Sequence, residues 1–522
     1  MSAQNSRVTA PNTLYIILGL TLLFAGFPPL LADEPAIQWQ WSGRDRDERL
    51  SGAPQFHSLT QHPLGSRLLA SARESATQAL DYLSPSLSES LVAAVADADT
   101  SWSLWLNAEG GIRGHAVAVR GNATANDMIE TAARDWAARC PECALAPLSG
   151  GGENDWSLTP KSGEWSLFRL NDWTLLEWGE AQEESALEGI LKTGAPLGWG
   201  EEGYLRLGMR MDALFPHASG PLPRFQGVWR VESGKARTRG TFVFPEPILT
   251  SEDDLRIPNE VIKDPISSFA VFRGLDALFP KAATKLGELG LPDVLQELYV
   301  WSEDHGWTLP YVTHFAAPAK DARAAVQELA NQIQEPANSA LAGWGLGGLE
   351  RIDDPVQIHW KNLPMVLPFI RAVDQGDQPY VTGGFFPLEQ HTDPAPEALL
   401  QQVRDRPDLR AYHWEITPLR FSQIARLQSI GNVLVQVARA SESEEETLFA
   451  PPLDWTPLAE PFSEGFSNAI TEIVAITPTE WELTRTSGLG FIAAEWNLAL
   501  IWLQQQGAFT TTEATPHTPP AP

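Results

Sequence analysis

The sequence lacks the motifs on which common catalytic sites depend. It has no Gly-x-Ser-x-Gly elbow for a serine hydrolase, no His-Glu-x-x-His for a zinc peptidase and no Gly-x-x-x-x-Gly-Lys loop for nucleotide phosphates. Adjacent carboxylates such as Asp253 and Asp254 are expected by chance among 66 acidic residues, and neighbours on a strand point to opposite faces. We therefore expect a non-catalytic protein without a bound cofactor or metal.

Cysteine is also scarce, since the chain has only Cys140 and Cys143, in the motif Cys-Pro-Glu-Cys. The motif follows a predicted helix over 126–139, whereas a thioredoxin-like redox centre needs its first cysteine at a helix N-terminus. A zinc site needs at least two further ligands, and no histidine lies nearby. We favour a local disulfide or an incidental pair, with redox and metal-binding roles as the alternatives.

Basic residues are few relative to acidic ones. The chain has 37 Lys and Arg against 66 Asp and Glu, which gives a formal net charge of −29. Such a charge repels phosphate backbones, so we expect no nucleic-acid partner, and it disfavours docking on anionic membranes. With 522 residues, 43% of them hydrophobic, the composition is that of a globular protein of two or three domains.

The N-terminus has the three parts of an export signal. Arg7 precedes the apolar run Leu14–Phe27, a Pro-Pro pair follows, and Ala32 ends a usable cleavage site. The run is short for a membrane-spanning helix, and no cysteine lies nearby to carry a lipid. We expect cleavage and export to the periplasm or the outside. The alternatives are an uncleaved N-terminal membrane anchor and a buried N-terminal helix.

A hairpin followed by a helix occurs twice in the pattern. Residues 104–119 form the first hairpin, with a helix from about 124, and residues 299–315 form the second, with a helix from about 318. The turn glycines Gly111 and Gly306 fall in register. The pattern predicts an α+β fold of two related modules, each an antiparallel sheet with packed helices, which arose by internal duplication. The alternative is two unrelated α+β segments.

The predicted organisation places the modules between less ordered segments. Residues 204–211 alternate cleanly between polar and apolar and predict a strand with one buried and one solvated face. The apolar stretch Leu489–Leu503 predicts a helix that is buried between modules or lies against a membrane or partner. The predicted segments are a signal peptide (1–32), a linker (33–57), module 1 (58–248), a linker (249–264), module 2 (265–505) and a disordered tail (506–522).

Two Gly-x-Gly-x-x-Gly matches, at 198–203 and 343–348, carry no dinucleotide site. Both follow a helix and lead toward a strand, which is the reverse of the order that places pyrophosphate at a helix N-terminus. We interpret them as helix-to-strand turns.

Tryptophan is the one clear excess, with 20 residues, many of them on predicted strands. Exposed indoles bind sugars and cations, whereas buried indoles fill a core, and we favour the core. The second hairpin gathers several aromatic and titratable residues, with His305 beside two acids as a weak metal cluster. We therefore take it as the candidate ligand or partner surface. Its residues are Trp301, Glu303, Asp304, His305 and Trp307.

The layout resembles uncharacterised secreted bacterial proteins of the domain-of-unknown-function type. The resemblance spans about residues 58–505 and is carried by the strand–turn–strand–helix unit 165–192 and by Trp-Glu-Leu-Thr-Arg-Thr at 481–486. It implies no known activity. We expect an exported, non-catalytic protein that binds an envelope protein or glycan, or serves the envelope structurally. The alternative is a glycan-binding or carbohydrate-active protein that uses strand tryptophans and acidic residues in a cleft between the modules.

Overall fold

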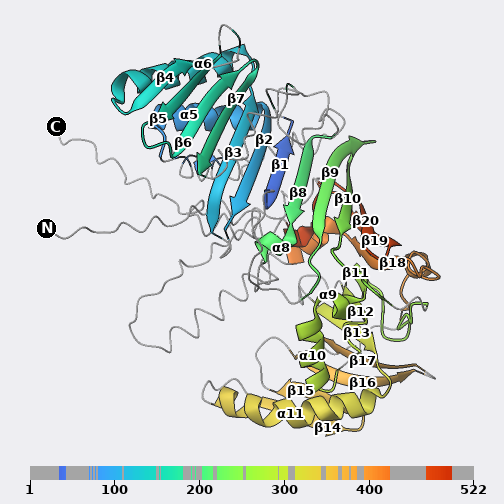
Figure 1. Cartoon of the computed structure of the whole chain (residues 1–522). Coiled ribbons are helices and arrows are strands. Elements are labelled where there is room, and N and C mark those ends of the chain that lie inside the picture. Colours follow the sequence, from blue (N-terminus) through green and yellow to red (C-terminus); the bar gives the residue numbers. More distant parts are fainter. Residues whose placement is uncertain are drawn as a thin grey trace, which may run out of the picture.

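The computed structural model combines helices with one large antiparallel sheet (Figure 1). The described residues are 35–42, 82–107, 111–148, 155–179, 203–215, 220–250, 254–291, 293–303, 312–342, 348–361, 367–375, 378–384, 393–423, 466–488 and 490–495, with a few isolated positions at 70–80, 152, 190 and 194. The helices are α5 (Pro85–Asp97), α6 (Ala123–Arg139), α8 (Met211–Leu214), α9 (Leu275–Leu278), α10 (Pro280–Glu288), α11 (Ala322–Ala342) and α12 (Glu397–Leu400).

Twenty strands pair side by side in this sheet. The first ten are β1 (Ile37–Trp41), β2 (Asp99–Leu106), β3 (Ile112–Arg120), β4 (Cys143–Pro147), β5 (Trp156–Pro160), β6 (Trp165–Leu170), β7 (Trp173–Gly179), β8 (Leu205–Arg210), β9 (Arg224–Glu232) and β10 (Lys235–Val243). The second ten are β11 (Ile266–Arg273), β12 (Glu297–Glu303), β13 (Val312–Pro318), β14 (Gly348–Asp353), β15 (Val356–Lys361), β16 (Phe369–Gln375), β17 (Gln378–Gly384), β18 (Leu409–Glu415), β19 (Ala469–Thr477) and β20 (Glu480–Ser487).

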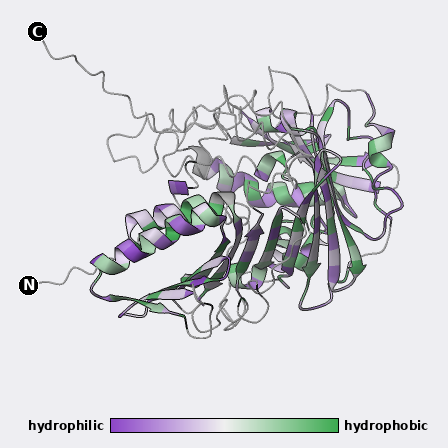
Figure 2. Cartoon of the chain, turned by 90° about the horizontal axis from the view of Figure 1, so that it is seen from above, coloured by the Kyte–Doolittle hydropathy of each residue, from purple (hydrophilic) through white to green (hydrophobic). Residues whose placement is uncertain are grey.

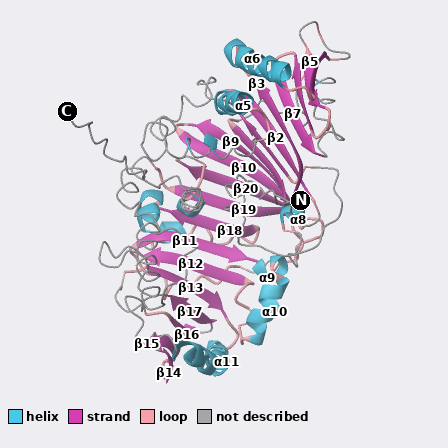
Figure 3. Cartoon of the chain, turned by 90° about the vertical axis from the view of Figure 1, so that its left-hand side faces the viewer, coloured by secondary structure: helices cyan, strands magenta, loops and turns pink. Residues whose placement is uncertain are grey.

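The strand order is the same in both halves of the sheet. The first half runs β4-β5-β6-β7-β3-β2-β1-β8-β9-β10, and the second runs β14-β15-β16-β17-β13-β12-β11-β18-β19-β20 (Figure 3). The halves join where β10 pairs with β20, with Arg239 opposite Thr484. The two predicted modules therefore share one continuous sheet.

The main helices of both halves lie on the same face of the sheet. In the first half, α5 and α6 pack over strand residues such as Val117 and Leu176. In the second half, α11 packs over β15–β17 through Val326 and Leu329. Both long helices begin with a side-chain cap: Asn122 accepts a hydrogen bond from the Ala125 amide, and Asp321 accepts one from Ala324. These helices leave the other face of the sheet to be covered by different segments.

Two stretches predicted as linkers contribute to the folded core instead. The segment 33–57 contains β1, which pairs with β2 on one side and β8 on the other. Its sequence Ile-Gln-Trp-Gln-Trp alternates with the period of a strand, and the charged residues after it masked that signal. In the segment 249–264, Ile257, Val261 and Ile262 are buried against the second half of the sheet. Apolar residues at this spacing stabilise the fold by burial.

A short C-terminal segment is anchored at the centre of the sheet. Arg485 on β20 makes an ion pair with Glu495, in which one guanidinium nitrogen donates to both carboxylate oxygens at 2.8 and 3.0 Å. The Ala493 amide donates to the buried carboxylate of Glu415, at 2.8 Å, and the Trp229 indole donates to the Gly490 carbonyl at 3.2 Å. This is the start of the apolar stretch 489–503, of which the structure describes only 490–495. Its one acidic residue, Glu495, therefore has a structural role.

Candidate functional site

The centre of the sheet has one apolar face and one face rich in arginine. Hydrophilic and hydrophobic residues alternate along strands of the sheet (Figure 2). Along β9 and β10, buried and exposed residues alternate because successive side chains point to opposite sides. Phe225 and Trp229 lie on the apolar face and are buried. We call the opposite side of β8–β10 the arginine face. Its residues include Arg206, Arg210, Arg224, Arg230, Arg237 and Arg239.

Among the residues that the structure describes, the arginine face is open at the centre of the sheet and covered on its flanks. One row of paired residues crosses it from Gln40 through Arg206, Val228 and Arg239 to Thr484. Followed outward into the first half, this row continues into a buried cluster that includes Ala118 and Leu175. Followed into the second half, it enters a cluster that includes Val271, Tyr299 and Tyr412. No described segment covers the trough between these flanks, where the two halves meet.

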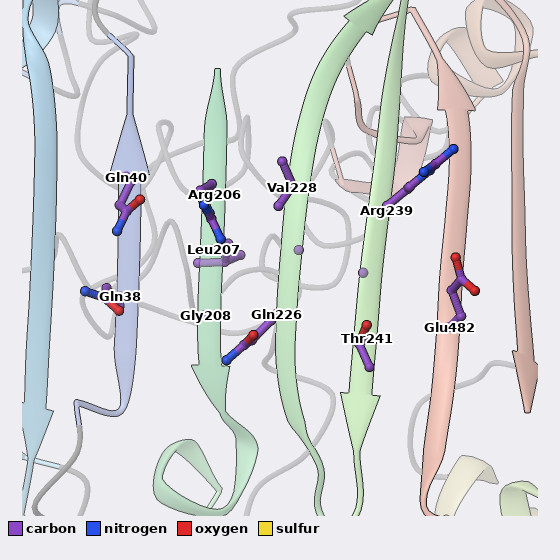
Figure 4. A pocket seen from close by; sticks show the side chains of 12 residues that line it. Gln38, Gln40, Arg206, Leu207, Gly208, Gln226, Val228, Arg239, Thr241 and Glu482 are labelled. Carbon is purple, nitrogen blue, oxygen red and sulfur yellow. The ribbon is translucent and has the colours of Figure 1, made fainter. Parts of the chain in front are cut away.

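A hollow of about 490 Å³ lies in this trough (Figure 4). That volume falls in the range of small-molecule sites, roughly 300–1,000 Å³. Side chains from five neighbouring strands line it, and most of them are polar. We call it the arginine hollow, and its lining residues are Gln38, Gln40, Arg206, Leu207, Gly208, Gln226, Gly227, Val228, Arg239, Gly240, Thr241 and Glu482.

The electrostatics of the arginine face are unusual for a sheet in an acidic chain. Arg210 is the cross-strand partner of Arg224, and Arg230 is the partner of Arg237. Like charges directly opposite each other destabilise a sheet. Arg210 has a carboxylate partner in Asp212, at 2.6 Å. The face thus concentrates positive charge on three adjacent strands.

Two arginines of the hollow have no carboxylate of their own. Within the described part of the chain, the side chains of Arg206 and Arg239 make no hydrogen bond or ion pair. The same holds for Gln226, Thr241 and Glu482. Figure 4 shows Arg239 extended toward β20 and Gln226 directed toward β8. The hollow therefore presents hydrogen-bonding capacity that the described fold does not use.

Gly208 forms part of the floor of the hollow. Glycine inside a strand weakens it, and often marks a bulge or a place where a ligand or another backbone comes close. The pairing of β8 with β1 and β9 is regular through Gly208, so it is not at a bulge. A Cβ built there would meet only the Gln38 carbonyl, at 3.8 Å. Packing and strand geometry therefore do not require a glycine at this position, and a larger side chain here would protrude into the hollow.

Two of the five residues of the surface predicted for the second hairpin are buried, Trp301 and Glu303. Trp301 is fully buried, stacks on His314 with ring centroids 5.4 Å apart, and donates a hydrogen bond to Glu303. Glu303 is buried as well. The prediction of an accessible surface is therefore wrong for Trp301 and Glu303. Their strand, β12, lies inside the sheet between β11 and β13, and both side chains are buried. Asp304, His305 and Trp307 lie outside the described residues.

The tryptophans of the described residues pack in the interior. Fourteen of the 20 are described, and none of these is exposed. They stack on one another and on histidines, as Trp136 does on Trp165 with centroids 4.9 Å apart. The described part of the chain therefore offers no exposed indole platform for a sugar.

Other candidate chemistry is also limited. No group of three or more His, Cys, Asp or Glu residues with metal-binding geometry occurs in the described ranges. Of the adjacent carboxylates, Asp353 and Asp354 lie exposed at the β14–β15 turn, while Glu201 and Glu202 lie outside the described residues. Cys140 and Cys143 are joined in a disulfide directly after α6. No helix of the described residues is long and apolar enough to cross a membrane.

The arginine hollow was not identified from the sequence, although part of its signal is visible there. The alternation in 204–211 marks Arg206, Gly208 and Arg210 as one side of a strand. The same period-two pattern of arginines recurs in β9 and β10. Three arginine-bearing strands in succession, in a chain with a net charge of −29, would have indicated a basic surface.

Comparisons with known proteins give little further information. No protein-family model matches the chain, and no curated protein matches it. Among solved structures, the chain is similar to two crystal forms of TP0453, I and III, with 7% sequence identity in each. The TM-scores are 0.22 and 0.20, over 47% of this chain and 82% and 84% of those chains.

Proposed function

We propose that this protein is an exported, non-catalytic binding protein of the cell envelope, and that it binds its partner at the arginine hollow. The observation that carries the proposal is that, within the described residues, the arginine face is open at the centre of a sheet whose flanks are covered. Arg206 and Arg239, which have no partner among the described residues, and the room for a side chain at Gly208 add to it. The export signal that the sequence of residues 1–32 predicts supports the location.

A catalytic role has less support at this site. Glycoside hydrolysis needs two carboxyl groups across a cleft. Glu482 is the single carboxylate among the residues that line the hollow. A glycan-binding role through tryptophan is also less supported, since every described indole is at least partly buried. Polar recognition by arginine and amide side chains fits the hollow better.

Photo-cross-linking in the native host tests the proposal. A benzophenone amino acid at position 226, in the hollow, is expected to give discrete cross-linked products, which mass spectrometry of the protein recovered from the envelope fraction detects whether the partner is large or small. The same probe at Met128, which is exposed on α6, is the matched control and should give none of these products. Identical product patterns from both positions would argue against binding at the hollow. Protein that stays in the cytoplasm with Met1 intact would contradict export.

We also infer that the two halves of the sheet arose by internal duplication. The inference is supported by the shared order of ten strands, by long helices on one face and by side-chain caps at Asn122 and Asp321. An experimental structure should superpose the halves strand for strand. A different strand order for β14–β17 than for β4–β7 would contradict the duplication. The turn at Gly306, which the sequence sets in register with Gly111, lies outside the described residues.

A further inference from the structure

We propose that the arginine hollow binds a small oligoanion, a molecule that carries two or more phosphate or carboxylate groups. Arg206 and Arg239 each hold one anionic group. This inference rests on the proposed function in placing binding at the hollow, and it adds the chemistry of the ligand.

The spacing of the two arginines sets the number of anionic groups. Arg206, Val228 and Arg239 are cross-strand partners on the three neighbouring strands β8, β9 and β10. Neighbouring strands lie about 4.8 Å apart, so the Cα atoms of the two arginines are about 10 Å apart. Figure 4 shows the Arg239 side chain extended toward β20, on the side away from β8 and Arg206, so the two guanidinium groups suit two separate anionic groups of one molecule. Val228 offers it an apolar contact midway.

The choice of arginine favours oxyanions over other ligands. A guanidinium presents planar, paired donors that match carboxylate and phosphate oxygens, and it stays charged at all physiological pH values. The cross-strand pairs Arg210–Arg224 and Arg230–Arg237 add positive charge at either end of the same strands. A bound anion lowers the repulsion within such like-charged pairs. Local positive charge in an otherwise acidic chain also directs an anion to this face.

The remaining lining residues define the edges of the site. Gln38, Gln226 and Thr241 are neutral side chains that donate and accept hydrogen bonds, and they lie in one row with Gly208. Glu482, the cross-strand partner of Thr241, adds a negative charge on the β20 side. It repels an anion, and so it marks the edge of the site on the β20 side. Removal of that charge should therefore strengthen binding.

Isothermal titration of the full chain with tripolyphosphate and with citrate tests this inference. We expect at least one of them to bind, with an affinity that falls as salt is raised. Arg206→Ala and Arg239→Ala should each weaken binding about tenfold or more, because each removes charge-assisted hydrogen bonds. Glu482→Gln should tighten binding several-fold. Lys235→Ala removes one charge from the same strand outside the hollow, and it should change the affinity less than about twofold.

The two probes separate the sources of the anionic groups. Binding of tripolyphosphate alone assigns a phosphate ligand, and binding of citrate alone assigns a polycarboxylate. No binding of either at millimolar concentration would overturn the inference, as would equal affinity for the wild type and both arginine variants. Cross-links from position 226 that persist in that case would leave the proposed function standing with a different ligand chemistry.

Discussion

Replacement of Phe225 by alanine is expected to lower the free energy of unfolding by about 3–5 kcal/mol, the usual cost of truncating a buried phenylalanine. The Phe225 ring lies over Gly227 and Gly240 on the apolar face, where a Cβ on either glycine would approach the ring to within 2.7 and 2.6 Å. Truncation leaves a cavity over two residues that have no side chains to fill it. Urea unfolding of both proteins measures the difference.

A neighbouring residue and a double substitution make this test specific. Gln226→Ala alters the next residue, which is exposed on the arginine face, and it should change stability by less than about 0.5 kcal/mol. Gly240→Ala should destabilise the wild type, yet cost less in the Phe225→Ala background, where its Cβ has room. Strictly additive effects of Phe225→Ala and Gly240→Ala would show that the ring does not pack over this glycine.

Acidification is expected to destabilise the fold through His115. Burial lowers the pKa of His115 from 6.5 to about 4. Above pH 6.5 His115 is neutral in both the folded and the unfolded protein, so its burial does not lower the free energy of unfolding through protonation. As the pH falls, the unfolded chain takes up a proton near 6.5 and the folded protein does so only near 4. Folding stability is therefore lost over that interval, by about 3 kcal/mol in full.

The surroundings of His115 explain this shift and supply the test. Its ring stacks on Trp178 at 5.5 Å, and its Nε2 lies 2.8 Å from the Tyr82 hydroxyl. His115→Phe keeps an aromatic ring in the stack but does not titrate. The free energy of unfolding, measured between pH 7 and pH 4.5, should fall more steeply for the wild type than for the variant. Parallel curves would contradict a role for His115.

Local patterns in the sequence identified many of the elements. The first hairpin and its helix are confirmed as β2, β3 and α6, and the alternation in 204–211 is confirmed as β8. These predictions were correct because apolar residues recur with one period in strands and with another in helices. One local signal was missed: Asp-Ala-Leu-Phe-Pro occurs twice, at 212–216 and 276–280. It follows β8 and β11, which do not correspond in the two halves, so the duplication does not explain it.

The site itself depends on pairing between distant strands. β10 and β20 meet with Arg237 opposite Thr486, 249 residues away in the sequence. No local pattern encodes such a partner, because strand pairing is decided by side-chain packing across the whole sheet. The burial of Trp301 could not be predicted for the same reason. A tryptophan near a polar turn resembles a binding residue in the sequence, and only the strands paired on either side of it show that it is buried. The basic surface was hidden by the chain's strongly negative total charge.

Substitution of Gly208 by alanine and by leucine tests most directly the claim that a partner binds at the arginine hollow. The position has room for a side chain and lies on the floor of the hollow. Gly208→Ala and Gly208→Leu should both fold with stability close to that of the wild type. Partner cross-linking from position 226 is expected to be retained by the alanine variant and lost in the leucine variant, whose side chain fills the hollow. A folded Gly208→Leu protein that cross-links as the wild type does would contradict binding at the arginine hollow.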